Sequence, residues 1–297
     1  GTTLTMDNAL KIMMVKSAND IAVAVAETVG GSVPGFAERM NREAARLGMD
    51  RSRFVNPHGL PDERQVTTAR DMALLARALL TEFPQYRDYH KVHAIRIGGK
   101  VLKNFNPLLE RYPGANGMKT GFICASGYNL VASAQRGERE MIAVVFGEYG
   151  GMARAERAAA LLDRGFQAAG FGGMRTTLAS VSSGNGYTTA LDMRPFVCAP
   201  QQLADASEAN LQPTSASAVA EDIQPVSRLS QPLYLGPPIV VSVEAPPKPA
   251  KLGEPGFVAR IPKPRPALPG DRVEAGFADA FAPVAQPLGA APGPAQA

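Results

Sequence analysis

The chain has 297 residues, of which 45% are hydrophobic, and a formal net charge of +4, as expected for one large globular domain or two small ones. The positive charge is spread along the sequence and no basic cluster alternates with aromatic residues, so a nucleic-acid-binding surface is not expected. No run of 18 apolar residues is present, so no membrane-spanning segment is expected.

The composition changes near residue 170. Of the 25 prolines, 19 lie after this point, and the ratio of Lys and Arg to Asp and Glu changes from 22 against 17 to 9 against 10. We therefore expect a folded domain over residues 1–170 and a Pro/Ala-rich, largely disordered tail over residues 171–297. One or two short strands are expected in this tail, near residues 176–198 and 233–243. A spacer or partner-binding arm, with an unknown partner, is the functional alternative for the tail.

Helical periodicity fills the first part of the folded domain. Side chains placed to cap helices are Thr5 or Asp7 for the first helix, Ser32 for the third and Thr68 for the fourth. A second helix over residues 20–29 is expected to begin at Asn19, which is a good capping residue. Taken alone, Ser17 and Asn19 are therefore more typical of a helix junction than of catalysis.

Strand patterns follow the helices. Residues 93–102 predict a small hairpin, and residues 118–124, 128–135 and 141–146 predict an antiparallel meander. A helix over residues 152–169 is expected to close the domain. The predicted fold is α/β of the mixed α+β kind, an antiparallel sheet flanked by helices.

The cysteines and histidines predict no metal centre. Cys124 and Cys198 fit no metal spacing, and we expect unpaired thiols, with a disulfide as the alternative. His90 and His93 are three residues apart but lack a helix and a third ligand. His58 lies in a predicted loop, where it is expected to form hydrogen bonds within the loop rather than carry protons. No cofactor is expected.

Two short motifs carry the chemistry of a serine acyl-transfer site. On a predicted strand, Lys119 places a positive charge that pairs with a substrate carboxylate, Thr120 adds a hydroxyl, and Gly121 lets a substrate backbone approach. Upstream, Ser17 could relay a proton to a leaving amine, and Asn19 could hold a substrate amide. Alone, Lys119 could equally be an exposed lysine that discourages strand pairing at a sheet edge.

These motifs belong to a longer pattern. Residues 3–170 resemble the serine D-Ala-D-Ala carboxypeptidases, the low-molecular-mass penicillin-binding proteins of peptidase family S11. The matching motifs follow in the family's order: Leu4-Thr5-Met6, Lys16-Ser17-Ala18-Asn19-Asp20, Asn56-Pro57-His58-Gly59-Leu60, Thr67-Thr68-Ala69-Arg70-Asp71-Met72-Ala73 and Gly114-Ala115-Asn116-Gly117-Met118-Lys119-Thr120-Gly121. The resemblance implies a β-lactamase/transpeptidase-like fold.

The resemblance also assigns roles to residues. Ser17, Asn19 and Lys119 would be catalytic. Substrate binding would fall to Lys119, Thr120, Gly121 and Phe122, with the Phe122 backbone N–H as an oxyanion donor. The implied ligands are peptidoglycan stem peptides ending in D-Ala-D-Ala and, for the intact protein, β-lactams.

The attacking serine of the family lies in a Ser-x-x-Lys motif before the Ser-x-Asn loop. No serine of the 297 residues is followed three positions later by lysine. We therefore expect an N-terminally truncated catalytic domain that is inactive alone, with the nucleophile and a periplasmic signal peptide encoded upstream of Gly1. A β-lactamase of the same fold and a non-catalytic peptidoglycan-binding or scaffolding protein are the alternatives.

Overall fold

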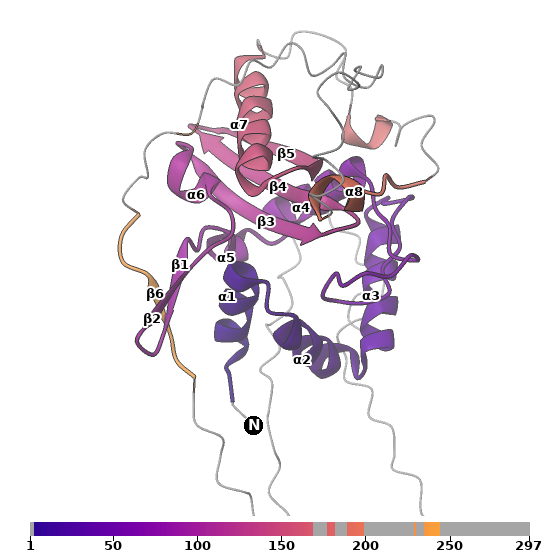
Figure 1. Cartoon of the computed structure of the whole chain (residues 1–297), viewed down its shortest axis with the longest axis vertical. Coiled ribbons are helices and arrows are strands. Elements are labelled where there is room, and N and C mark those ends of the chain that lie inside the picture. The colour runs from indigo at the N-terminus through magenta and orange to yellow at the C-terminus, as the bar shows by residue number, and fades with distance from the viewer. Residues whose placement is uncertain (1–2, 169–176, 182–188, 199–228, 230–234, 244–297) are drawn as a thin grey trace, which may run out of the picture.

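The computed structural model describes residues 3–168, 177–181, 189–198, 229 and 235–243. A three-stranded antiparallel sheet forms the centre of this part of the chain (Figure 1). Helix α7 (Gly151–Gln167) covers one face of the sheet, and α4 (Ala69–Glu82) packs on the other. This arrangement confirms the predicted α+β fold.

The first helices begin at hydroxyl caps, as predicted. Helices α1 (Met6–Lys16), α3 (Val33–Arg46) and α4 follow Thr5, Ser32 and Thr68, and each hydroxyl accepts a hydrogen bond from a backbone N–H of the first turn. Each cap satisfies a donor that the helix itself leaves unpaired.

Helix α2 (Asn19–Gly30) departs from the prediction. Ala18 occupies the N-cap without a side-chain hydrogen bond, and Asn19 is the first helical residue, so the predicted Asn19 cap is wrong. The reason lies in the preceding turn. Ser17 ends α1 in the left-handed conformation (φ 52°, ψ 40°), which leaves a single extended residue before α2 begins.

The central sheet has the order β3-β4-β5, formed by Ala115–Ile123, Gly127–Arg136 and Arg139–Glu148. Within the described residues β3 pairs only with β4, so β3 is an edge strand. A second, smaller sheet has the order β2-β1-β6, formed by Lys100–Lys103, Ala94–Ile97 and Ile239–Val241. Three short helices complete the first 168 residues: η1 (Pro84–Tyr86), α5 (Arg87–His90) and α6 (Leu108–Arg111).

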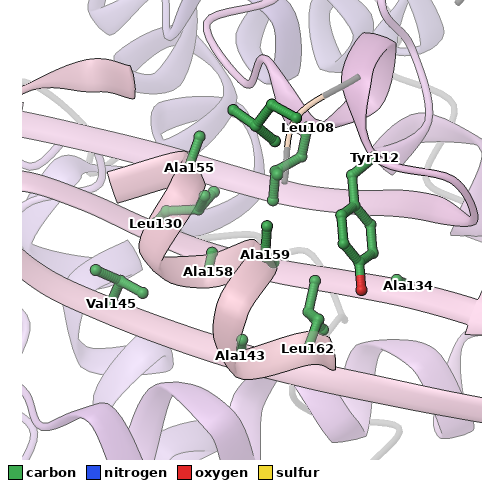
Figure 2. Close-up of a cluster of buried hydrophobic side chains, with 12 residues drawn as sticks. Leu108, Tyr112, Leu130, Ala134, Ala143, Val145, Ala155, Ala158, Ala159 and Leu162 are labelled. Carbon is green, nitrogen blue, oxygen red and sulfur yellow. The ribbon is translucent and has the colours of Figure 1, made fainter. Parts of the chain in front are cut away.

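The main hydrophobic core lies between α7 and the central sheet (Figure 2). Helix α7 contributes mainly alanines, which allow the helix to approach the strands closely. Side chains of successive strand residues point to opposite faces. Leu130 of β4 therefore packs under α7, whereas Val131 packs against Ala76 and Leu80 of α4.

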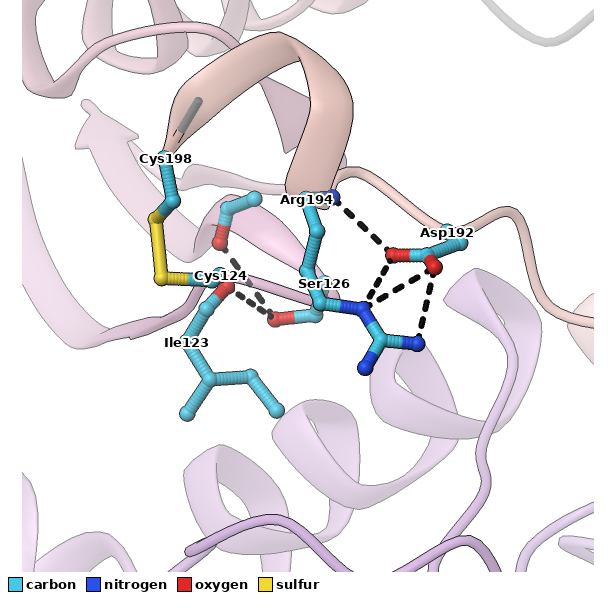
Figure 3. Close-up of a disulfide and its surroundings, with 7 residues drawn as sticks. Ile123, Cys124, Ser126, Asp192, Arg194 and Cys198 are labelled. Atoms are coloured by element: carbon cyan, nitrogen blue, oxygen red, sulfur yellow. Dashed lines mark hydrogen bonds and ion pairs between the residues drawn. A yellow bond between two sulfur atoms is a disulfide. The ribbon is translucent and has the colours of Figure 1, made fainter. Parts of the chain in front are cut away.

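The two cysteines form a disulfide, so the prediction of unpaired thiols is wrong. Cys124 and Cys198 are joined with a Cα–Cα distance of 5.7 Å (Figure 3). Cys124 directly follows β3, and the Met193 backbone N–H donates a hydrogen bond to the Ala125 carbonyl. This backbone contact brings residue 198 to the end of β3, although the two cysteines are 74 positions apart.

The predicted tail strands have different outcomes. The strand predicted near residues 233–243 is confirmed as β6. In the range 176–198, the described residues 177–181 and 189–198 contain a 3-10 helix, η2 (Leu178–Ser180), and the helix α8 (Arg194–Val197), but no strand, and the rest of the range lies outside the described residues. Pro195 suits the first turn of a helix and lacks the N–H that a strand ladder needs.

Most of the predicted tail lies outside the described residues, so its disorder and the domain boundary at residue 170 stay predictions. Within the described ranges, no helix is long and apolar enough to cross a bilayer.

Candidate active site

Ser17 lies at the junction of α1 and α2. Its backbone N–H donates to the Met13 carbonyl at 2.9 Å and ends the first helix. It is the only non-glycine residue with positive φ among the described residues. Such backbone conformations are uncommon outside glycine and cluster at functional sites.

Lys119 reaches this junction from β3. Its ammonium group donates hydrogen bonds to the Ser17 hydroxyl and, at 2.7 Å, to the Thr120 carbonyl. The two motifs predicted from the sequence, 102 positions apart in the chain, therefore meet through a direct contact.

Lys119 is largely buried, and this environment changes its protonation. Burial, and secondarily the nearby Arg154 guanidinium, lower the pKa of Lys119 to about 8. Both causes disfavour the charged form. The ammonium is therefore close to its titration point near neutral pH, and a carboxylate brought beside it would favour the charged form.

The residues after Lys119 change from buried to exposed along the strand. Thr120 is buried, whereas Gly121 and Phe122 are exposed. Apart from its chain neighbours, a methyl group added at Gly121 would contact only the Asn129 Cβ, at 3.9 Å. The Phe122 ring packs on Tyr128 with a centroid distance of 4.2 Å.

Asn19 is not joined to the contact between Ser17 and Lys119. Its side chain is exposed at the start of α2, and no hydrogen bond links it to either residue. The structure thus brings Ser17 and Lys119 together and leaves Asn19 at the edge of the site.

Arg154 is a site residue that the sequence analysis missed. It is buried in α7, and its guanidinium donates to the backbone carbonyls of Gly121 and Asn129, both at 3.2 Å, and of Phe105 at 3.1 Å. Burial lowers the pKa of Arg154. The available signal was an arginine four positions before Ala158, on the otherwise apolar stripe of α7.

The first half of β3 is enclosed by side chains. Asn106 donates to the Gly117 carbonyl at 3.2 Å. A methyl group at Gly117 would come within 3.0 Å of the His90 Cβ and 2.9 Å of the Ser133 hydroxyl. Only the second half of the strand, from Gly121 onward, is therefore open to solvent.

The structure also tests the role predicted for His58. His58 accepts a hydrogen bond from the Leu60 backbone N–H at 3.1 Å, which confirms its role within the loop. No group of three His, Cys, Asp or Glu side chains in the part of the chain that the structure describes could hold a metal ion.

The fold, first, is that of the penicillin-binding proteins and DD-transpeptidases. The D-alanyl-D-alanine carboxypeptidase DacD of Francisella tularensis superposes with a TM-score of 0.54 at 29% identity, covering 55% of this chain and 52% of that protein. Penicillin-binding protein D2 of Listeria monocytogenes, solved in its ampicillin-bound form, superposes with a TM-score of 0.51 at 28% identity, covering 54% and 67%.

The family follows from the sequence. Residues 1–150 match the model of peptidase family S11, D-alanyl-D-alanine carboxypeptidase, and the chain belongs to this family. The D-alanyl-D-alanine carboxypeptidase DacF of Bacillus subtilis is 39% identical over 153 residues, which are 50% of this chain. The chain spans only 39% of the length of that relative.

Proposed function

We propose that this protein supplies the substrate-binding part of a serine-type D-Ala-D-Ala carboxypeptidase of the periplasm. The substrate would be a peptidoglycan stem peptide, and the reaction would pass through an acyl-serine intermediate during cell-wall remodelling. The observation that carries the proposal is the contact between the Lys119 ammonium and the Ser17 hydroxyl beside the open edge of β3.

The roles of the side chains follow from their chemistry. The Lys119 ammonium would pair with the terminal carboxylate of the substrate, and the Thr120 hydroxyl would add a hydrogen bond to the same group. Ser17, bonded to Lys119, would pass a proton to the departing D-Ala amine. Asn19, exposed at the start of α2, would hold the substrate amide, and the Phe122 backbone N–H would be one oxyanion donor.

The disulfide supports the proposed compartment. Disulfides persist in oxidising environments such as the bacterial periplasm and are rare in the cytosol. The bond between Cys124 and Cys198 is therefore consistent with a secreted protein.

Binding is the first test, because it does not require the nucleophile. A peptide ending in D-Ala-D-Ala should bind more tightly with a free carboxylate than with a terminal amide, and Lys119→Ala should remove this difference. Lys91→Ala, which removes an exposed lysine, should preserve it. Isothermal titration calorimetry measures the six affinities, two for each of the three proteins. Equal affinities of the unmodified protein for the two peptides would contradict the assigned role of Lys119.

A non-catalytic peptidoglycan-binding protein is the second candidate. The contact between Ser17 and Lys119 would serve such a protein as well, because binding a carboxylate needs no nucleophile. Both candidates predict that this chain forms no covalent adduct with a fluorescent penicillin on a denaturing gel. Labelling of the chain would show that the nucleophile lies within it. That result would contradict the non-catalytic candidate and the assignment of the nucleophile to a Ser-x-x-Lys outside these residues. A Ser-x-x-Lys encoded upstream of Gly1 would favour the enzyme over the binding protein.

A further inference from the structure

The open half of β3 determines in which direction a bound peptide extends along the strand. A peptide whose carboxylate lies at Lys119 can extend along β3 either toward Ala115 or toward Ile123. The first direction is closed, because Asn116, Gly117 and Met118 are buried and the Asn106 side chain donates to the Gly117 carbonyl. The second is open at Gly121 and Phe122. A substrate therefore runs antiparallel to β3, with its amino-terminal part toward Ile123.

The end of β3 is where α8 is attached. The disulfide joins Cys124, the residue after Ile123, to Cys198 of the segment that carries α8 (Figure 3). Met193 at the start of this helix is buried, and its N–H bonds to the Ala125 carbonyl at 2.9 Å. The helix is thus fixed at the point toward which the amino-terminal part of the substrate extends.

The surface beside this end presents aromatic rings. Phe196 of α8 and Tyr149, which follows β5, are 39% and 65% exposed, and their rings contact edge to face with a centroid distance of 6.1 Å. Phe122 is also 45% exposed at the open end of β3. Rings that remain exposed while packed on each other offer a preformed apolar face to a ligand.

The charges of this surface are paired. Arg194 donates to Asp192 at 2.9 Å, and Arg157 donates to Glu148 at 3.0 Å. An anionic membrane surface would be expected to attract unpaired cations instead. The aromatic rings and paired charges fit an uncharged ligand with an apolar face and polar edges, which describes a pyranose sugar.

We propose that Tyr149, at the end of β5, and Phe196, held beside it by the disulfide, bind the amino sugar that is attached to the stem peptide. In peptidoglycan the amino end of the stem peptide is joined to an N-acetylated amino sugar, and this is the end that lies toward α8. The inference rests on the proposed function, because it uses the stem peptide as the ligand of β3.

The test compares two ligands, a stem pentapeptide ending in D-Ala-D-Ala and the same pentapeptide joined to its disaccharide. Calorimetric titration of the whole chain should give about threefold to tenfold tighter binding of the disaccharide form, the range expected for aromatic packing. Phe196→Ala and Tyr149→Ala should each lower this ratio toward one. Val101→Ala, an exposed apolar residue of β2, should leave the ratio unchanged.

The affinity for the free pentapeptide shows whether each variant is correctly folded. The aromatic variants should not change this affinity, so a lower ratio cannot be attributed to a folding defect. A Cys124→Ser/Cys198→Ser double variant should also lose the preference, since α8 is then no longer attached. A ratio of one in the unmodified chain, or a ratio that the aromatic variants do not alter, overturns the inference and leaves the proposed function standing. Binding of neither ligand overturns both.

A vesicle-binding measurement tests whether the same surface contacts a membrane instead. Co-sedimentation with phosphatidylglycerol vesicles should be absent or unaffected by Phe196→Ala. Vesicle binding that is lost in the same aromatic variants would show that this surface contacts a membrane and would overturn the saccharide assignment.

Discussion

Burial of Lys119 links its charge to the stability of the fold. The pKa of a lysine in an unfolded chain is near 10.4, whereas burial and Arg154 lower the pKa of Lys119 to about 8 in the folded state. Between these two values the unfolded chain binds a proton that the folded chain does not. The free energy of unfolding therefore increases with pH across this window. At neutral pH, Lys119 lowers the free energy of unfolding.

The first prediction is a pH-dependent difference between the unmodified protein and Lys119→Met. The free energy of unfolding of the unmodified protein, minus that of the variant, should rise by about 2.5 kcal/mol between pH 8 and pH 10.5. Urea unfolding at four pH values measures this difference, in which the other titrating groups cancel. Lys119→Arg, which stays charged throughout, should lack the rise. A flat difference for Lys119→Met would show that Lys119 titrates normally.

The second prediction concerns Arg154. Arg154→Met should lower the free energy of unfolding by about 2–4 kcal/mol, because the carbonyls of Phe105, Gly121 and Asn129 lose their shared donor. Arg157→Met, one turn later in α7, removes only a partly exposed ion pair with Glu148 and should cost less than about 1 kcal/mol. Urea unfolding of both variants tests the contrast. Equal losses would mean that the three carbonyls are satisfied without Arg154.

Sequence reasoning identified Ser17 and Lys119 because their motifs are local. A Ser-x-Asn at a helix junction and a Lys-Thr-Gly on a strand are each visible within a few residues. Arg154 was missed because its role depends on carbonyls from three distant segments, which no local pattern displays. Asn19 was misassigned as a cap because capping preference does not reveal the left-handed turn at Ser17.

At the scale of elements, β6 shows how a distant segment completes a core. It pairs parallel with β1, and Val241 is buried in a cluster with α1 and β1 residues, including Ile12, Val15 and Ile95. Asn8 of α1 also donates to the Ser242 carbonyl at 2.9 Å. The second sheet therefore depends on a strand about 140 positions from its neighbours.

The third prediction compares two adjacent valines of β6. Val241, 2% exposed, loses core packing when changed to alanine, so Val241→Ala should lower the free energy of unfolding by about 2 kcal/mol. Val240, 68% exposed, has no such packing, and Val240→Ala should cost less than about 0.5 kcal/mol. Urea unfolding of both variants measures the contrast. Equal effects would indicate that β6 is not docked on β1 in solution.

Most elements of the first 168 residues were predictable because they carry their own periodicity and end signals, whereas the short helices η1 and α5 were not predicted. The meander strands and the hydroxyl-capped helices lie close to their predicted positions. The sequence did not predict the partner of β6 or the course of residues 189–198. Both depend on contacts between segments that are distant in the sequence and differ in composition. For residues 189–198 that contact includes the disulfide between Cys124 and Cys198.

At the scale of the whole molecule, the disulfide joins the segment that carries α8 to the end of β3 in the central sheet. A helix of four residues is not stable alone, so α8 depends on its attachment. Within the described residues, the Met193 hydrogen bond and the contact between Phe196 and Tyr149 support the same docking. We therefore expect the attachment of this segment to the site to depend on the bond between Cys124 and Cys198.

The fourth prediction is the effect of removing this bond. A Cys124→Ser/Cys198→Ser double variant should lower the free energy of unfolding by about 2–4 kcal/mol, because the unfolded chain is no longer closed across 74 positions. Limited chymotrypsin digestion should also cleave after Phe196 faster in the variant, since α8 is released from β3. Cleavage after Phe105, which is exposed but outside the closed loop, provides the matched control and should keep its rate. Unchanged stability together with unchanged cleavage at Phe196 would show that noncovalent contacts alone hold α8 against the sheet.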